Sequence, residues 1–166
     1  MGAPLSMDAA YRKYSAYVAY IGIRIIGRDD ELDDLVQDVF IEAIKGLKSL
    51  RDAAAIKGWF ATVTVRLATR RLRMQKLRRT LGFSQVDHDA VWPGASPEQN
   101  AAISKVYRSL QGVAAKQRAA WILRVVEQEP LDHVAKACGC SLATAKRWIN
   151  EVQIVVAGPA KKEGLR

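Results

Sequence analysis

The stretch DDLVQDVF, residues 33–40, carries the helical period from which the fold of this chain is predicted. Its apolar residues alternate with acids and an amide, and the spacing continues on both sides through Leu32, Leu35, Val36, Val39, Phe40, Ala43, Ile44 and Leu47. Steps of three and four residues place such side chains on one face of an amphipathic helix. The same period recurs in residues 11–25 and 56–72. We therefore predict that residues 7–80 form a small helical bundle.

Charge is distributed unevenly along the chain. The 166 residues carry a formal net charge of +9 and a pI near 9.8, yet residues 29–38 contain several acids and no Lys or Arg. Farther on, a run of cations without any acid comprises Arg66, Arg70, Arg71, Arg73, Lys76, Arg78 and Arg79. A solvated helix face usually mixes signs, whereas like charges at helical spacing repel one another unless a polyanion is present. The run therefore favours a phosphate-bearing partner over a merely solvated surface.

The helical period stops at GFSQVDHDAVWPGASP, residues 82–97. The Gly, Pro and Ser content of this stretch is typical of a linker, which predicts two domains. Trp92 is expected to dock on a neighbouring surface, the alternative being an isolated exposed hydrophobe. His88 has Asp87 and Asp89 beside it but no further ligands, so we expect no metal site there.

The C-terminal part contains a helix-turn-helix pattern in PLDHVAKACGCSLATAKRWINEV, residues 130–152. Pro130 suits the first helical position, Gly139 a left-handed turn and Ser141 the N-cap of a second helix. That helix is expected to turn Leu142 inward, with Ala145, Ile149 and Val152, and Trp148 outward, with Thr144, Lys146, Arg147 and Asn150. The spacing is that of two closely crossing helices, although any tight helical hairpin shares it.

Several function classes are disfavoured by composition. Charges interrupt every apolar run before the roughly 20 residues of a membrane span, and the N-terminus lacks the apolar core of a signal peptide, so we expect a soluble cytoplasmic protein. Cys138 and Cys140 are interpreted as small residues lining the turn rather than zinc ligands, because only His133 is near. With two His and no phosphate loop or nucleophile elbow, we expect no enzyme, no catalytic residue, no metal and no cofactor.

Four segments together resemble the extracytoplasmic-function class of bacterial RNA polymerase sigma factors. They are DDLVQDVF, GWFATVTVRLATRRLR, LQGVAAKQRAAWILRVV and the helix-turn-helix VAKACGCSLATAKRW. The resemblance covers essentially the whole chain. It implies an all-α fold of two small helical domains: residues 1–81 for promoter melting and polymerase-clamp binding, a flexible linker at 82–98, and residues 99–166 with a helix-turn-helix for the upstream promoter element.

The resemblance also implies partners and site residues. In this class the acidic helix docks on the basic clamp helices of the largest polymerase subunit, a role that falls here to Asp34, Gln37 and Asp38. The cation run, from Arg66 to Arg79, would contact phosphates of the downstream promoter element, and the helix-turn-helix would contact the upstream element through Ser141, Thr144, Lys146 and Arg147. A flap of the second-largest subunit and an anti-sigma factor are further implied partners, and a membrane is not.

Some positions depart from the family pattern. Arg66 and Arg70 stand where relatives commonly carry Asn and Asp, and Val113-Ala114 stands where Leu-Pro is usual. Trp59 and Phe60 are possible platforms for an unstacked base, but both fall on the apolar stripe and we expect them in the core. The predicted function is a sigma factor that directs promoter-specific initiation. The alternative is a sigma-like or helix-turn-helix transcriptional regulator without full initiation activity.

Overall fold

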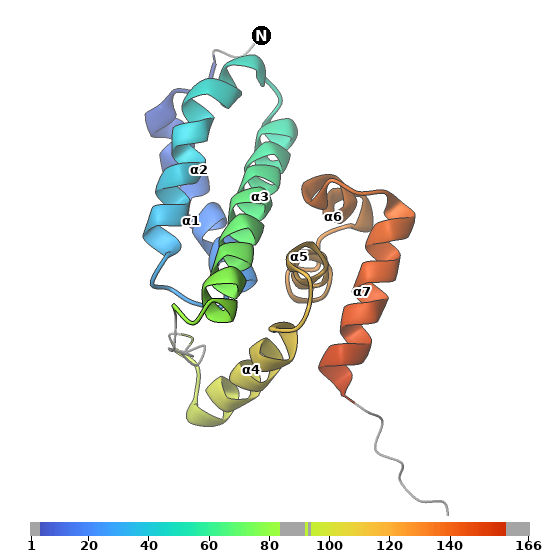
Figure 1. Ribbon diagram of the computed structural model, residues 1–166. Coiled ribbons are helices and arrows are strands. Elements are labelled where there is room, and N and C mark those ends of the chain that lie inside the picture. Colours follow the sequence, from blue (N-terminus) through green and yellow to red (C-terminus); the bar gives the residue numbers. More distant parts are fainter. Residues whose placement is uncertain (1–3, 84–91, 93, 159–166) are drawn as a thin grey trace, which may run out of the picture.

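Figure 1 shows the computed structural model, which describes residues 4–83, 92 and 94–158 and is built of helices over that part of the chain. The first unit consists of α1 (Met7–Ile26), α2 (Leu32–Gly46), the 3-10 turn η1 (Leu47–Ser49) and the long α3 (Ala53–Thr80). The second unit consists of α4 (Pro97–Leu110), α5 (Ala115–Trp121), the π-helical turn η2 (Ile122–Val126), α6 (Leu131–Cys138) and α7 (Leu142–Ala157). The predicted all-α fold class is confirmed.

Short local signals determine where these helices begin and end. The side chain of Ser6 caps α1 by accepting a backbone hydrogen bond at 3.2 Å, and Gly27 ends the helix in the left-handed region with φ 77°. Asp52 caps α3, and Ser96 opens a capping box at α4. The side chain of each N-cap accepts from a backbone N–H that has no partner inside the helix, and Gly27 tolerates the left-handed conformation at a helix end, so the breaks fall where the sequence supplies these residues.

Aromatic rings fill the centre of the first unit. Phe60 of α3 is fully buried, and its ring centre lies 4.9 Å from that of Tyr14 and 5.1 Å from that of Phe40. Trp59 packs over Gly46, where an added Cβ would lie 2.3 Å from the indole. The expectation of core packing is confirmed for Phe60, whereas Trp59 is partly buried and packs against the core. Gly46 is the residue that leaves room for the indole ring.

The helix-turn-helix is present in the second unit. Gly139 adopts the left-handed conformation with φ 65° between α6 and α7, and Ser141 caps α7. Pro130 is the N-cap of α6, one residue before the predicted position. Two orientations predicted for α7 were wrong: Leu142 is 47% exposed, whereas Trp148 is half-buried against the core. The cause is that α7 packs against α4 and α5 as well as α6, which shifts its buried face.

The two units lie against each other, with α5 and α6 beside α3 (Figure 1). The middle of α3 is therefore buried on several sides, including Thr64 and Thr69, whose hydroxyls donate to backbone carbonyls one turn earlier at 2.7 and 2.8 Å. The division into residues 1–81 and 99–166 stays a prediction. Most of the predicted linker (84–91 and 93), His88 included, lies outside the described residues. None of the helices described is long and apolar enough to cross a membrane.

Candidate protein and nucleic-acid interfaces

The acidic residues of α2 lie on the side of the helix opposite the core. Asp34 and Gln37 are exposed and Asp38 is half-exposed, whereas the neighbouring Leu35 and Val39 are fully buried. Asp34 and Asp38 border a groove shared with α3, and Gln37 borders a groove shared with α1. The structure thus keeps the predicted trio on the solvent side of α2, but it turns the two acids and the amide toward different neighbours.

The groove between α1 and α2 is apolar and has a volume of about 730 Å³. Tyr11 of α1 and Ile41 and Ile44 of α2 line it, and each of the three is about half exposed. The sequence period had placed Tyr11 and Ile44 in the core stripe. Tyr11 and Ile44 lie outside the core because the apolar stripes of α1 and α2 are wider than the area that α3 covers. Exposed apolar side chains beside a charged rim are typical of a protein interface.

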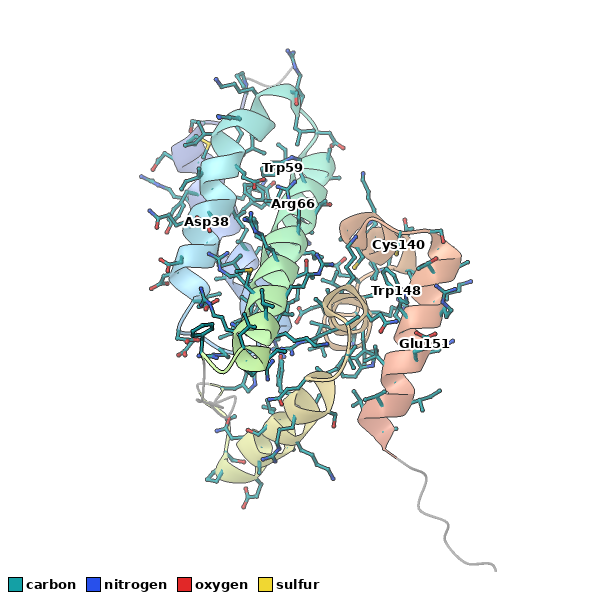
Figure 2. All side chains as sticks on the ribbon, in the orientation of Figure 1. Asp38, Trp59, Arg66, Cys140, Trp148 and Glu151 are labelled. Atoms are coloured by element: carbon teal, nitrogen blue, oxygen red, sulfur yellow. The ribbon has the colours of Figure 1, made fainter. Side chains whose placement is uncertain are left out.

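The basic residues of α3 occupy its C-terminal half. Those on the surface are Arg66, Arg70, Arg73, Lys76, Arg78 and Arg79. Arg71 is half-buried, and its Nη2 donates to Asp38 Oδ2 at 2.7 Å, while Arg66 forms an ion pair with Glu42. Figure 2 shows Asp38 on α2 and Arg66 on the adjacent α3. Acids of α2 therefore neutralise part of the basic helix, and the other exposed cations form a positive surface suited to phosphates.

The residues predicted to contact the upstream element lie in the first turns of α7. Ser141 Oγ accepts from the backbone N of Thr144 at 3.1 Å and donates to Thr144 Oγ1 at 2.9 Å, so these two hydroxyls stabilise the start of the helix. Lys146 and Arg147 are exposed, and Arg147 Nε lies 3.9 Å from Glu151 Oε1. The cations are thus presented to solvent from a capped helix end.

A buried arginine that sequence reasoning did not single out joins the two units. Arg118 of α5 donates from Nε to Ile25 O and from Nη2 to Ile26 O, both at 2.8 Å. These carbonyls belong to the last turn of α1, where the helix dipole favours a cation. Burial lowers the pKa of Arg118 to about 10, so the guanidinium stays charged at neutral pH. No local pattern marks Arg118, because its partners lie 93 and 92 positions away in the sequence.

Tyr107 of α4 completes this junction. Its hydroxyl donates to Arg24 O at 2.6 Å, and its ring centre lies 5.2 Å from the guanidinium carbon of Arg118. Burial raises the pKa of Tyr107 to about 12, so the phenol stays protonated and able to donate. The ring centre of Trp92 lies 5.9 Å from that of Tyr107 and 4.8 Å from the guanidinium carbon of Arg24. The prediction that Trp92 docks on a neighbouring surface is confirmed.

The cysteines lie at the turn of the helix-turn-helix. Cys138 is buried and Cys140 is partly exposed. Burial raises the pKa of the Cys138 thiol to about 12, so it is protonated at neutral pH and packs as a small apolar group. Within the described ranges no group of three or more His, Cys, Asp or Glu side chains is arranged to hold a metal ion.

Comparison with known proteins identifies the first unit. The Sigma-70 region 2 family model matches residues 10–78. The "Probable ECF RNA polymerase sigma factor SigI" of Mycobacterium tuberculosis is 23% identical over 166 aligned residues, which cover 91% of this chain and 57% of the relative. RNA polymerase sigma factor SigV of Bacillus subtilis is 27% identical over 119 residues, covering 72% of this chain and 69% of the relative. The chain therefore spans little more than half the length of SigI.

The fold is also similar to that of a solved structure. The sigma factor RpoE of Bartonella quintana, crystallised with the anti-sigma factor NepR, matches with a TM-score of 0.65 at 22% identity, over 88% of this chain and 91% of the other. The family match falls on the three helices that carry the acidic and basic surfaces, and the fold match extends over both units. Residues 10–78 thus match the Sigma-70 region 2 family, and the chain is similar over most of its length to sigma factors of the extracytoplasmic-function class.

Proposed function

We propose that this chain is an RNA polymerase sigma factor, which binds core polymerase and directs promoter-specific transcription initiation. The observation that carries the proposal is the placement of an acidic and a basic surface on adjacent helices, α2 and α3, within one region 2 domain. A basic polymerase surface and the phosphates of promoter DNA have opposite charges. One small domain of this design can therefore contact both partners at once.

The α2 surface is the proposed binding site for the clamp helices of the largest polymerase subunit. Asp34 and Asp38 provide charge complementary to a basic helix pair, which speeds association and sets orientation. The apolar groove beside them, lined by Tyr11, Ile41 and Ile44, supplies the apolar contacts from which most of the affinity would come. The arrangement matches the apolar centre and polar rim of protein interfaces.

Helices α3 and α7 are the proposed DNA-binding elements. Arg70, Arg73 and Arg78 are exposed and form no ion pair with another described residue, so they are available to phosphates of the downstream element. Lys146 and Arg147 lie near the start of α7, and the corresponding end of a helix-turn-helix recognition helix reaches base edges in the major groove. The downstream contacts would mainly set affinity and the upstream ones sequence preference.

Further partners follow from the same proposal. The second unit would contact the flap of the second-largest polymerase subunit, and an anti-sigma factor would bind the chain when it is inactive. The RpoE structure supports the latter, because it contains the anti-sigma factor NepR. The protein would work in the cytoplasm, where core polymerase is, and it would act by binding rather than by enzymatic chemistry.

Charge reversal at Asp34 tests the polymerase-binding surface. Asp34 is exposed and forms no ion pair within the described part of the chain, so Asp34→Lys leaves the contact between Asp38 and Arg71 in place. A cation against a basic partner costs about 2 kcal/mol, which raises the Kd for core polymerase roughly thirtyfold. Glu98→Lys on α4 makes the same charge change away from the α2 surface and should raise the Kd clearly less.

Runoff transcription with core polymerase measures the activity itself. The wild-type chain should direct a defined transcript from its promoters, and Asp34→Lys should reduce the transcript in parallel with polymerase affinity. A wild-type chain that binds promoter DNA but neither binds core polymerase nor supports runoff contradicts the proposal and favours a regulator without initiation activity.

A further inference from the structure

Acids of α2 and arginines of α3 form ion pairs across the boundary between the two proposed binding surfaces. Arg71 Nη2 lies 2.7 Å from Asp38 Oδ2, and Arg71 Nε lies 3.9 Å from Glu31 Oε2. Arg66, five residues closer to the start of α3, pairs with Glu42. Residues assigned to polymerase and residues assigned to DNA are therefore bonded to each other in the free chain.

The two contacts of Arg71, with Asp38 and Glu31, border a groove of about 490 Å³ between the helices. Its charged lining comes from acids of α2 (Glu31, Asp34 and Asp38) and arginines of α3 (Arg70, Arg71 and Arg78). The Asp38 side chain is 50% exposed and the Arg71 side chain 19% exposed, so a partner from solvent can reach the carboxylate directly. The guanidinium needs a side-chain rotation away from α2 before it presents its donors fully to a phosphate.

We propose that Asp38 and Arg71 are an exchangeable ion pair that couples polymerase binding to DNA binding. A cation of the polymerase takes the place of Arg71 on Asp38, and Arg71 then turns to a DNA phosphate. This inference rests on the proposed sigma-factor function, because it assumes that α2 and α3 bind those two partners. Each partner consequently binds the free chain less tightly than it binds a chain that already carries the other partner.

The physical basis is that the pair is broken only once. Either partner alone must break the contact between Asp38 and Arg71, whereas the second partner meets a residue that is already released. Exposed or partly exposed ion pairs contribute about 0.2–1 kcal/mol, so each binding step is weakened by up to roughly fivefold in the free chain. Coupling of this kind is reciprocal: DNA must favour polymerase binding by the same factor by which polymerase favours DNA binding.

Binding of the full chain to a short fluorescent DNA, followed by anisotropy, tests the DNA arm. Asp38→Asn should tighten DNA binding by roughly three- to fivefold, because Arg71 is released. Asp33→Asn removes the same charge from α2 on the side that faces the α1 groove, and it should have a clearly smaller effect. In an Arg71→Gln background the gain from Asp38→Asn should disappear, whereas simple charge repulsion between Asp38 and the phosphates would persist.

Binding to core polymerase tests the other arm with the same variants. Arg71→Gln should tighten polymerase binding by about the factor by which Asp38→Asn tightens DNA binding, because both variants remove the same pair. Arg73→Gln is the matched control, since Arg73 has no acid partner among the described residues, and its effect should be clearly smaller. Glu31→Gln breaks the longer contact to Arg71 and should shift DNA binding in the direction of Asp38→Asn by less.

The outcomes separate this inference from the proposed function. Wild type that binds neither polymerase nor DNA contradicts both. If the wild type binds both partners but Asp38→Asn changes DNA binding no more than Asp33→Asn does, the exchange is overturned and the proposed function stands. A third outcome is that Asp38→Asn and Arg71→Gln each bind both partners more weakly than the wild type and each have a lower Tm. That result assigns the pair a structural role and also overturns the exchange.

Discussion

Replacement of Arg118 by Met should weaken the contact between the two helical units. The change removes two charge-assisted hydrogen bonds of 2.8 Å to Ile25 O and Ile26 O and leaves both buried carbonyls without these donors. Hydrogen bonds of this type contribute about 1.5–3 kcal/mol each, and part of the loss is offset because a charge no longer has to be desolvated. We expect the free energy of unfolding to fall by about 2–4 kcal/mol and the Tm by roughly 6–12 °C.

Urea unfolding followed by circular dichroism measures this loss, and hydrogen exchange locates it. Lys116→Met, an exposed position on the same helix, is the control and should change the free energy of unfolding by less than about 0.5 kcal/mol. Amide protection in Arg118→Met should fall first at the end of α1 and on the face of α3 that contacts α5 and α6. A variant as stable as Lys116→Met, with unchanged protection at these sites, would refute the assignment of Arg118 as the contact that joins the units.

Three further outcomes are expected. Gly27→Ala should lower the free energy of unfolding by about 2–4 kcal/mol in urea titrations, because φ is 77° and the new Cβ would lie 2.5 Å from the Tyr107 ring; an unchanged midpoint contradicts this. Burial raises the pKa of Cys138 from 9.0 to about 12, so its stabilising contribution is complete below pH 9 and is lost as pH rises toward 12. Cys138→Ala should therefore lose less stability than wild type between about pH 8 and pH 10.5, and parallel losses would exclude the thiol as a cause. Arg73→Ala should weaken binding to all promoters alike and reduce by about one the slope of log K against log salt concentration, whereas Arg147→Ala should relax preference for the upstream element by about 1–3 kcal/mol. Selection from a randomised promoter library distinguishes the two variants. An unchanged upstream preference in Arg147→Ala would show that Arg147 does not read sequence.

The apolar groove between α1 and α2 shows how packing turns a correct pattern into a different surface. The helical period of α1 and α2 was predicted correctly, and so was the identity of their apolar residues. Tyr11 and Ile44 nevertheless face solvent, because a three-helix contact covers only part of each stripe. Periodicity reports that a face is apolar, but it does not report whether that face meets another helix or a partner protein.

The sequence by itself determined the helices, their ends and the identity of the charged surfaces. These features depend on interactions within a few residues: the period of DDLVQDVF, the left-handed glycines Gly27 and Gly139, and the cap at Ser141. Local backbone and side-chain chemistry decides such features wherever the rest of the chain lies. The run of cations on α3 was visible for the same reason.

Only the tertiary structure decided which faces meet and which charges neutralise one another. Asp38 and Arg71 are 33 positions apart, and Arg118 lies 93 positions from the carbonyl of Ile25. Whether such residues touch depends on how α5 and α6 pack on α3 and how α2 is rotated beside it, and no local pattern encodes that rotation. Half-burial of Arg71 and burial of Arg118 arise from this packing, because long-range contacts between helix faces are set by the shapes and volumes of all the side chains that share the core.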